Sequence, residues 1–154
     1  MRSLGYLSGF LILLLVLVIY RTAVPSADTT PPKATFGGVS LSIELVTTTA
    51  AQERGLGGRE NLAEDHAMLF VFDKSGNYGF WMKDMLIPID IFWLDDKGQV
   101  VYVKREVSPD TYPTVFYPPV PVTYVLETNA GFARAHNIAT GTPLELQNLH
   151  LISQ

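Results

Sequence analysis

The stretch FWMKDMLIPIDIFWL, residues 80–94, places charged side chains inside an apolar run. Lys83 follows an aromatic pair, and Asp90 lies between two isoleucines. An isolated buried carboxylate is costly, so Asp90 must be paired or hydrogen-bonded within the fold. If the start of this stretch is a strand, Trp81 and Lys83 lie on the same face of it. A Trp–Lys face suits an anion or a sugar, because the indole ring offers a stacking surface beside a cation.

Other residue types that do chemistry lack the spacing that their sites require. The three histidines, His66, His136 and His150, are far apart and form no H-x-H or H-E-x-x-H motif, so we predict no metal site. There is no G-x-S-x-G motif for a serine nucleophile. Cysteine is absent, which excludes disulfides, zinc–thiolate sites and thiol catalysis. The sequence therefore predicts no metal and no other cofactor.

Two further groups have a chemical and a structural interpretation. Glu53, Glu60 and Asp65 could supply paired carboxylates for glycoside hydrolysis, but charges on a helix surface explain them as well, and we prefer that interpretation. The glycines of GLGG, residues 55–58, follow a predicted helix and lead into no strand–helix phosphate cradle. We interpret them as a helix terminator.

The charge of the chain argues against nucleic acid as a partner. Arg2 and Arg21 are the charged residues of the first 21 positions, and the rest has 9 basic and 15 acidic residues, a net charge of −6. Phosphate binding needs lysine and arginine clustered on a face, which this balance does not favour.

Residues 1–21 are predicted to be a single-pass membrane anchor. Residues 4–20 form a run of 17 without charge, at the short end of the ~17–25 residues that a spanning helix needs. A cleavable signal peptide, which would give a secreted protein, is the alternative. Cleavage after Ala23 or Ala27 would place arginine or proline three residues before the cut, which makes both sites poor.

Behind the anchor, residues 22–33 include three prolines and are predicted to be an extended linker. Residues 34–154 then form one domain. The positive-inside tendency favours a cytoplasmic N-terminus because of Arg2, although Arg21 opposes it. We therefore expect the protein in the cell membrane, with this domain extracytoplasmic (periplasmic).

Hydrophobic periodicity along the domain predicts a mainly β fold. VSLSIELV alternates apolar and polar residues and is typical of a half-buried strand, whereas AMLFVF is a continuous apolar run. The predicted strands are 39–46, 67–72, 78–82, 90–94, 99–107, 122–128 and 143–152. The segment 108–121 has five prolines and is predicted to be a surface loop. Many short strands indicate a compact β-sandwich or barrel.

Two short helices complete the expected fold. The first spans about residues 50–56, with Thr49 and Gln52 forming a capping box. The second covers AGFARAH, between Asn129 as its cap and Asn137 at its end.

Four blocks of the sequence carry a family resemblance. ERGLGGRENL, AMLFVF, FWMKDMLIPIDIFWLDDKGQVV and YVLETNAGFARAHNIATG, in this order and spacing, resemble the DUF192 family, also called UPF0127. The resemblance covers about residues 40–150. It implies a compact, mostly β domain of sandwich type, often behind an N-terminal anchor or signal, and it implies no activity.

The chain departs from this family at three places. His66–Ala67 stands where a glycine usually precedes the Met-Leu-Phe run, and Asp84–Met85 replaces the commoner Asn-Thr. The proline-cysteine pair often found in the loop has no cysteine here, which argues against a thiol mechanism.

Charged residues within these blocks are the candidate site. Arg54, Lys83, Asp90 and Glu127 have apolar neighbours in the sequence. The interpretation we favour is that Arg54 or Lys83 pairs with Asp90 or Glu127 and fixes a loop against the sheet. The other is a ligand site, which these four residues would frame together with Trp81.

Three functions are compatible with the sequence. The first is a membrane-anchored binding or accessory domain for a small anionic or carbohydrate ligand, or for an envelope protein. The alternative is a hydrolase acting on envelope material, with Asp90 or Glu127 as acid/base. A purely structural accessory of a membrane complex is the third.

Overall fold

The computed structural model describes residues 31–147. The predicted anchor and all but the end of the predicted linker lie outside these residues, as does the end of the last predicted strand. Within the described residues no helix is long and apolar enough to cross a membrane. The described residues 31–147 belong to one compact unit.

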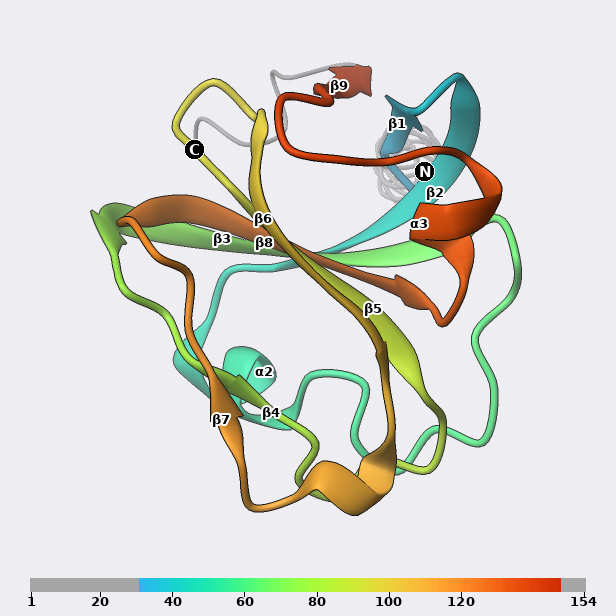
Figure 1. The fold of residues 1–154 in the computed structure, drawn as a ribbon, viewed down its shortest axis with the longest axis vertical. Helices are drawn as coiled ribbons and strands as arrows, with labels where there is room; N and C mark the ends of the chain where they lie inside the picture. Colours follow the sequence, from blue (N-terminus) through green and yellow to red (C-terminus); the bar gives the residue numbers. More distant parts are fainter. Residues whose placement is uncertain (1–30, 148–154) are drawn as a thin grey trace, which may run out of the picture. The chain divides into compact units, whose positions relative to one another are not determined.

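The core of this unit is a curled sheet of seven strands in the order β6-β5-β8-β3-β2-β1-β9 (Figure 1). Strands β2 and β3 are parallel, and the other neighbours are antiparallel. The strands are β1 (Lys33–Phe36), β2 (Val39–Val46), β3 (His66–Gly76), β5 (Ile89–Leu94), β6 (Val100–Val107), β8 (Val122–Asn129) and β9 (Leu144–Gln147).

Each predicted strand corresponds to an observed one, and the strand predicted at residues 39–46 has the same two ends as β2. The last observed strand begins at Leu144 and is described to Gln147. Strand β1 was not predicted, and it starts at Lys33, the last residue of the predicted linker.

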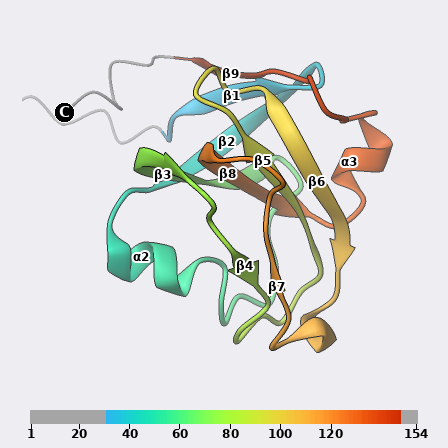
Figure 2. The ribbon, with the colours of Figure 1, turned by 60° about the vertical axis from the view of Figure 1, so that its left-hand side comes forward.

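A ribbon of two short strands, β4 (Phe80–Trp81) and β7 (Val115–Phe116), lies apart from the large sheet. Strand β7 falls within the proline-rich segment, which was predicted to be only a loop. The 3-10 helix η1 (Pro109–Thr111) precedes it. The ribbon lies beside α2, and α3 lies away from both (Figure 2).

The two short helices are α2 (Thr49–Arg54) and α3 (Phe132–Ala135). The cap of α2 is Thr48, whose side chain accepts from the amide of Ala51, so the helix is capped one residue before the predicted Thr49. The predicted capping box is wrong, because Ala51 has no side-chain group to return a hydrogen bond. The cap of α3 is Gly131 rather than Asn129, whose side-chain amide instead donates to the carbonyl of Leu62.

The sheet curls until its two ends meet over a short length. The amide of Val100 donates to the carbonyl of Thr142, and the amide of Leu144 donates to the carbonyl of Gly98. These bonds join the start of β6 to the start of β9. The protein is therefore mainly β, as predicted, and its second layer is built from α2, loops and the β4–β7 ribbon rather than from a second large sheet.

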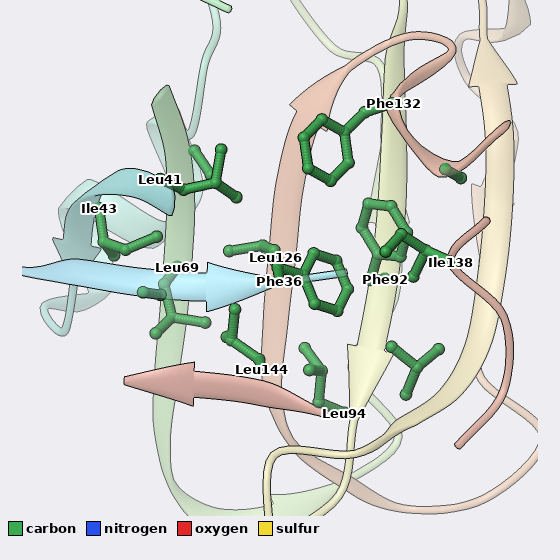
Figure 3. Close-up of a cluster of buried hydrophobic side chains, with 14 residues drawn as sticks. Phe36, Leu41, Ile43, Leu69, Phe92, Leu94, Leu126, Phe132, Ile138 and Leu144 are labelled. Atoms are coloured by element: carbon green, nitrogen blue, oxygen red, sulfur yellow. The ribbon is translucent and has the colours of Figure 1, made fainter. Parts of the chain in front are cut away.

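Each face of the sheet has a hydrophobic core. The α3-side core fills the inside of the curl, where Phe36 packs edge-on against Phe92 with ring centroids 5.0 Å apart and Phe132 closes one end (Figure 3). The α2-side core, which includes Phe70, Ile91 and Trp93, lies on the other face. The candidate site adjoins this second core.

Candidate functional site

Glu127 lies in the middle of the sheet, on strand β8. Its backbone neighbours are Met68 on β3 and Ile91 on β5, which both belong to the α2-side core. Directly opposed residues point to the same face, so the Glu127 side chain points toward α2. The residue is only 4 % exposed, and among the described residues its Oε2 has no hydrogen-bond partner.

Burial raises the pKa of Glu127 to about 8, and the positive charge of Arg59 opposes this rise only in part. At neutral pH the side chain is therefore a neutral carboxylic acid. A neutral carboxyl group can donate one hydrogen bond through its hydroxyl and accept others. The group is equipped to bind a ligand atom rather than to balance a charge.

The C-terminal end of α2 leaves room above this carboxyl group. Gly55 caps the helix with φ 51° and ψ −136°, a conformation that favours glycine. A Cβ atom added there would lie 3.4 Å from the Phe70 ring and 3.8 Å from Glu127 Oε2. The glycine that ends the helix thus also keeps the space beside Glu127 open.

Aromatic side chains from β3, β4 and the intervening loop form a wall of the site. Phe70 packs edge-on against Phe80 at 4.8 Å, and Phe72 stacks on Tyr78 at 3.5 Å between ring centroids. The indole N–H of Trp93 donates to the carbonyl of Tyr78 and fixes the loop that carries it.

These residues enclose a cavity of about 420 Å³, within the range of roughly 300–1,000 Å³ found for small-molecule sites. Its lining residues are Thr49, Gln52, Glu53, Arg54, Gly55, Leu56, Phe70, Phe72, Tyr78, Gly79, Phe80, Trp81, Lys83, Met85 and Glu127. Four of the five predicted site residues are among them, and Asp90 is not. The exposed side chains lie at the opening, and they belong to Thr49, Glu53, Arg54, Trp81 and Lys83. Lys83 Nζ is 5.8 Å from the centre of the Trp81 ring.

Asp90 lies on the opposite face of the sheet. It opposes Thr128, one position along from the pair formed by Ile91 and Glu127, so the two acids point in opposite directions. Asp90 Oδ1 accepts from the amide of Glu106 at 2.6 Å, and Oδ2 accepts from the amide of Ala133 at 2.7 Å. Asp90 thereby ties β6 and α3 to β5, which is a structural role.

The expected ion pair of Arg54 or Lys83 with Asp90 or Glu127 does not form. The ion pairs within residues 31–147 join Arg59 to Glu44 and Arg134 to Glu106, and the His66 ring lies in hydrogen-bond contact with Asp65. Within this part of the chain, Arg54 and Lys83 therefore form no ion pair, and neither does Glu53, which lines the same cavity. Asp90 is held by backbone amides instead.

Several residues of the cavity were not predicted to belong to it. Gly55 was interpreted only as a helix terminator, and Tyr78 and Phe72 only as parts of strands. Gln52 was assigned to a capping box, but its amide group donates to the carbonyl of Val71 at 2.9 Å and fixes α2 to the sheet. The signal that could have indicated Gly55 is its position directly after Arg54, one of the predicted site residues.

The other acidic and histidine candidates lie elsewhere. Of the three carboxylates considered for glycoside chemistry, Glu53 alone lines the cavity. His66 pairs with its neighbour Asp65, and His136 packs against Phe132. His150 lies outside the described residues. Within them, no three His, Cys, Asp or Glu side chains lie close enough together to hold a metal ion.

Two solved bacterial proteins share this fold. A protein of Sinorhizobium meliloti 1021, provisionally assigned as a transcription regulator, superposes with a TM-score of 0.69 at 28 % identity, covering 79 % of this chain and 98 % of its own. A protein of unknown function from Novosphingobium aromaticivorans DSM 12444 gives the same score and identity, covering 80 % of this chain and 91 % of its own.

No curated protein matches the chain in sequence. The sequence profile of DUF192, a family described as an uncharacterized ACR, matches residues 32–146. This match spans well over half of the chain and includes every residue that lines the cavity. The chain therefore belongs to the DUF192 family.

Proposed function

We propose that the cavity binds a small organic anion and that the protein is a binding module. The observation that carries this proposal is the buried Glu127 carboxyl group, whose Oε2 has no partner within residues 31–147. A polar atom buried without a partner is costly, and native structures seldom keep one without a use for it. A ligand atom in the cavity would satisfy it.

The opening adds the preference for an anion. Arg54 and Lys83 line it, and no ion pair within the described residues engages either side chain. Trp81 is 46 % exposed beside them and offers the face of its indole ring. The two cations outnumber Glu53, the one acidic residue exposed at the opening, and an anion held by them would have its body against the aromatic wall.

A thermal-shift screen of residues 31–154 tests this proposal. The compounds would be carboxylates, dicarboxylates, phosphates, sugars and metal ions. A ligand that binds only the folded state stabilises it by about 2.7 kcal/mol at a hundredfold excess over its dissociation constant. We expect an organic anion to raise the midpoint, and we expect Lys83→Ala to reduce that shift without unfolding the protein. If no anion raises the midpoint, the proposal fails.

A hydrolase is the second candidate, because a protonated carboxyl group in an apolar cavity is the state that a general acid needs. Glu127 is the residue that this function would use. Asp90 is a poor acid/base residue, since both of its oxygens accept bonds from backbone amides. For an enzyme, Glu127→Gln would abolish turnover of a bound ligand while preserving its binding, whereas a binding module would show no turnover in either form.

For the cellular setting we propose a membrane anchor in residues 1–21 and an extracytoplasmic domain. The uncharged run of residues 4–20 and the prolines after it support this arrangement. Protease added to intact spheroplasts should remove the domain from the full-length protein, and resistance to the protease would place it inside. An envelope protein is the alternative partner, and cross-linking of the full-length protein in membranes would detect it.

The provisional assignment of the S. meliloti protein as a transcription regulator does not extend well to this chain. A DNA-binding surface needs a cluster of basic residues, and beyond residue 21 acidic residues outnumber basic ones by 15 to 9. A small ligand suits the cavity and the charge better than DNA does.

A further inference from the structure

We infer that the ligand is a hydroxylated carboxylate of the sugar-acid class, with its carboxylate at Arg54 and Lys83 and a ring hydroxyl at Glu127. This inference rests on the proposed binding function and specifies its ligand. It follows from the distribution of polar and aromatic groups between the opening and the floor of the cavity.

The two ends of the cavity differ in chemistry. Arg54 and Lys83 are exposed, while Glu127 is buried, and no ion pair joins either cation to the acid. A ligand that reaches from the opening to the floor therefore meets charged groups first, the two cations and the one acidic residue Glu53, and a neutral carboxyl group last. Its two ends must differ in the same way, with an anion outside and an uncharged polar group inside.

The inner polar group is best matched by a hydroxyl. The protonated Glu127 offers one donor and several acceptor positions, and a hydroxyl can both accept and donate. An apolar ligand end would leave Glu127 Oε2 buried without a hydrogen bond, which is costly. A second carboxylate would bring a negative charge into a buried place where the structure already keeps Glu127 neutral.

The sides of the cavity favour a saturated ring that carries several hydroxyls. Phe70, Phe80 and Trp81 supply aromatic faces or edges. Thr49 and Gln52 line the cavity from the first turns of α2, three residues apart and so on one face of the helix. The amide nitrogen of Gln52 is engaged with Val71, and no donor within residues 31–147 bonds to its carbonyl oxygen. This oxygen is an acceptor for a second hydroxyl.

Calorimetric titration of residues 31–154 with matched ligands tests the inference. One pair is cyclohexanecarboxylate and the same ring with a hydroxyl opposite the carboxylate. The other pair is glucuronate and glucose, which differ in the anion. We expect the hydroxylated ring acid to bind about 10-fold tighter or more than its parent, because a site built to hydrogen-bond a hydroxyl discriminates against an analogue that lacks it. We expect glucuronate to bind and glucose to bind at least about 10-fold more weakly.

Two variants locate the hydroxyl. Glu127→Leu removes the polar group at similar size, so the preference for the hydroxylated ring acid should fall to about 2-fold or less. Glu127→Gln keeps a donor and an acceptor in the same place, so it should keep most of the preference. A preference that persists in Glu127→Leu would overturn the placement of the hydroxyl at Glu127.

The outcomes separate this inference from the proposed function. Equal affinity of the wild type for both ring acids would overturn the inference and leave the binding of an organic anion in place. A third ring acid, with an ammonium group in place of the hydroxyl, provides a further test. If it binds more tightly than the hydroxylated acid, Glu127 is ionised in the complex and the inference is overturned. Binding of none of the acids would overturn both.

Discussion

Asp90 and Glu127 are two buried acids on neighbouring strands, and they differ in the face of the sheet that they occupy and in their hydrogen-bond partners. Asp90 points to the α3 side, where the amides of Glu106 and Ala133 each donate to one of its oxygens. Glu127 points to the α2 side and leaves Oε2 without a partner in the described part of the chain. The first acid holds three elements together, and the second is kept at the floor of a cavity.

The difference arises from a single step of register. Strand β5 pairs Ile91 with Glu127 and Asp90 with Thr128, so the two acids lie on opposite faces although they are close in the sheet. Burial of an acid therefore does not reveal its role. What separates the two roles is whether the surrounding backbone supplies donors.

The largest effect is expected for Asp90→Asn. The asparagine amide would direct its NH₂ group at one of the two backbone amides, so a buried donor would face a donor. We expect a loss of ~2–4 kcal/mol in the free energy of unfolding, measured by urea denaturation at neutral pH. Unchanged stability would remove the structural role that we assign to Asp90.

Replacing the carboxyl group by a carboxamide should have the opposite effect at Glu127, where it should raise the free energy of unfolding. Glu127→Gln removes an ionisable group that the folded state keeps protonated, and we expect it to stabilise the protein by ~2–3 kcal/mol at neutral pH. The two variants, compared in the same denaturation experiment, are each other's control. A large loss of stability in Glu127→Gln would mean that its carboxyl group is satisfied after all.

The pH dependence of stability provides a second test of Glu127. Its pKa is about 8 in the folded protein against an ordinary value of 4.5, so between these values the folded state holds a proton that the unfolded state has lost. The stability contribution of this group is therefore fully present below about pH 4.5 and is lost as the pH rises to about 8. Urea midpoints measured across this range should decline more steeply in the wild type than in Glu127→Gln, and parallel profiles would contradict the raised pKa.

A smaller effect is expected at the glycines after α2, where the space beside Glu127 can be tested directly. Gly55 and Gly58 both have positive φ, 51° and 76°, so alanine at either should cost ~1–2 kcal/mol in the free energy of unfolding. An added Cβ at Gly55 would approach Phe70 and Glu127, whereas at Gly58 it would meet nothing within 4 Å. Both variants would be titrated with the organic acid that has the highest affinity for the wild type. We expect Gly55→Ala to weaken its binding and Gly58→Ala to leave it unchanged. Equal binding by both variants would mean that the ligand lies elsewhere.

The sequence predicted the strands well because their hydrophobic patterns are strong, as in the alternating residues of β2. It missed β1, a four-residue strand next to the prolines of the predicted linker, because so short a segment has little periodicity. It also indicated that the charges near residues 83–90 needed an explanation. Of the residues proposed from that stretch, Trp81 and Lys83 line the cavity, together with Arg54 and Glu127 from other family blocks.

The placement of Asp90 could not be predicted in the same way. Which face a residue occupies depends on strand register, and the pairing of β5 with β6 shifts between Ile89 and Ile91. The donors that satisfy Asp90 are backbone amides of Glu106 and Ala133, and a sequence gives no sign of which amides will lie near an acid. The unpartnered state of Glu127 is likewise visible only once its neighbours are placed.

The smallest effect on stability, and the clearest separation of fold from site, is expected for Lys83→Ala. Lys83 is exposed at the opening and makes no ion pair within residues 31–147, so its removal should change the free energy of unfolding by no more than ~0.5 kcal/mol. It should nonetheless weaken binding of an organic anion about 3- to 10-fold at low salt and less at high salt, because salt screens an exposed charge. Lys97→Ala, at an exposed lysine in the β5–β6 turn, is the matched control and should leave titration curves unchanged. If both variants weaken binding equally, the attraction comes from the overall charge of the domain, and Lys83 is not part of the site that Glu127 closes from below.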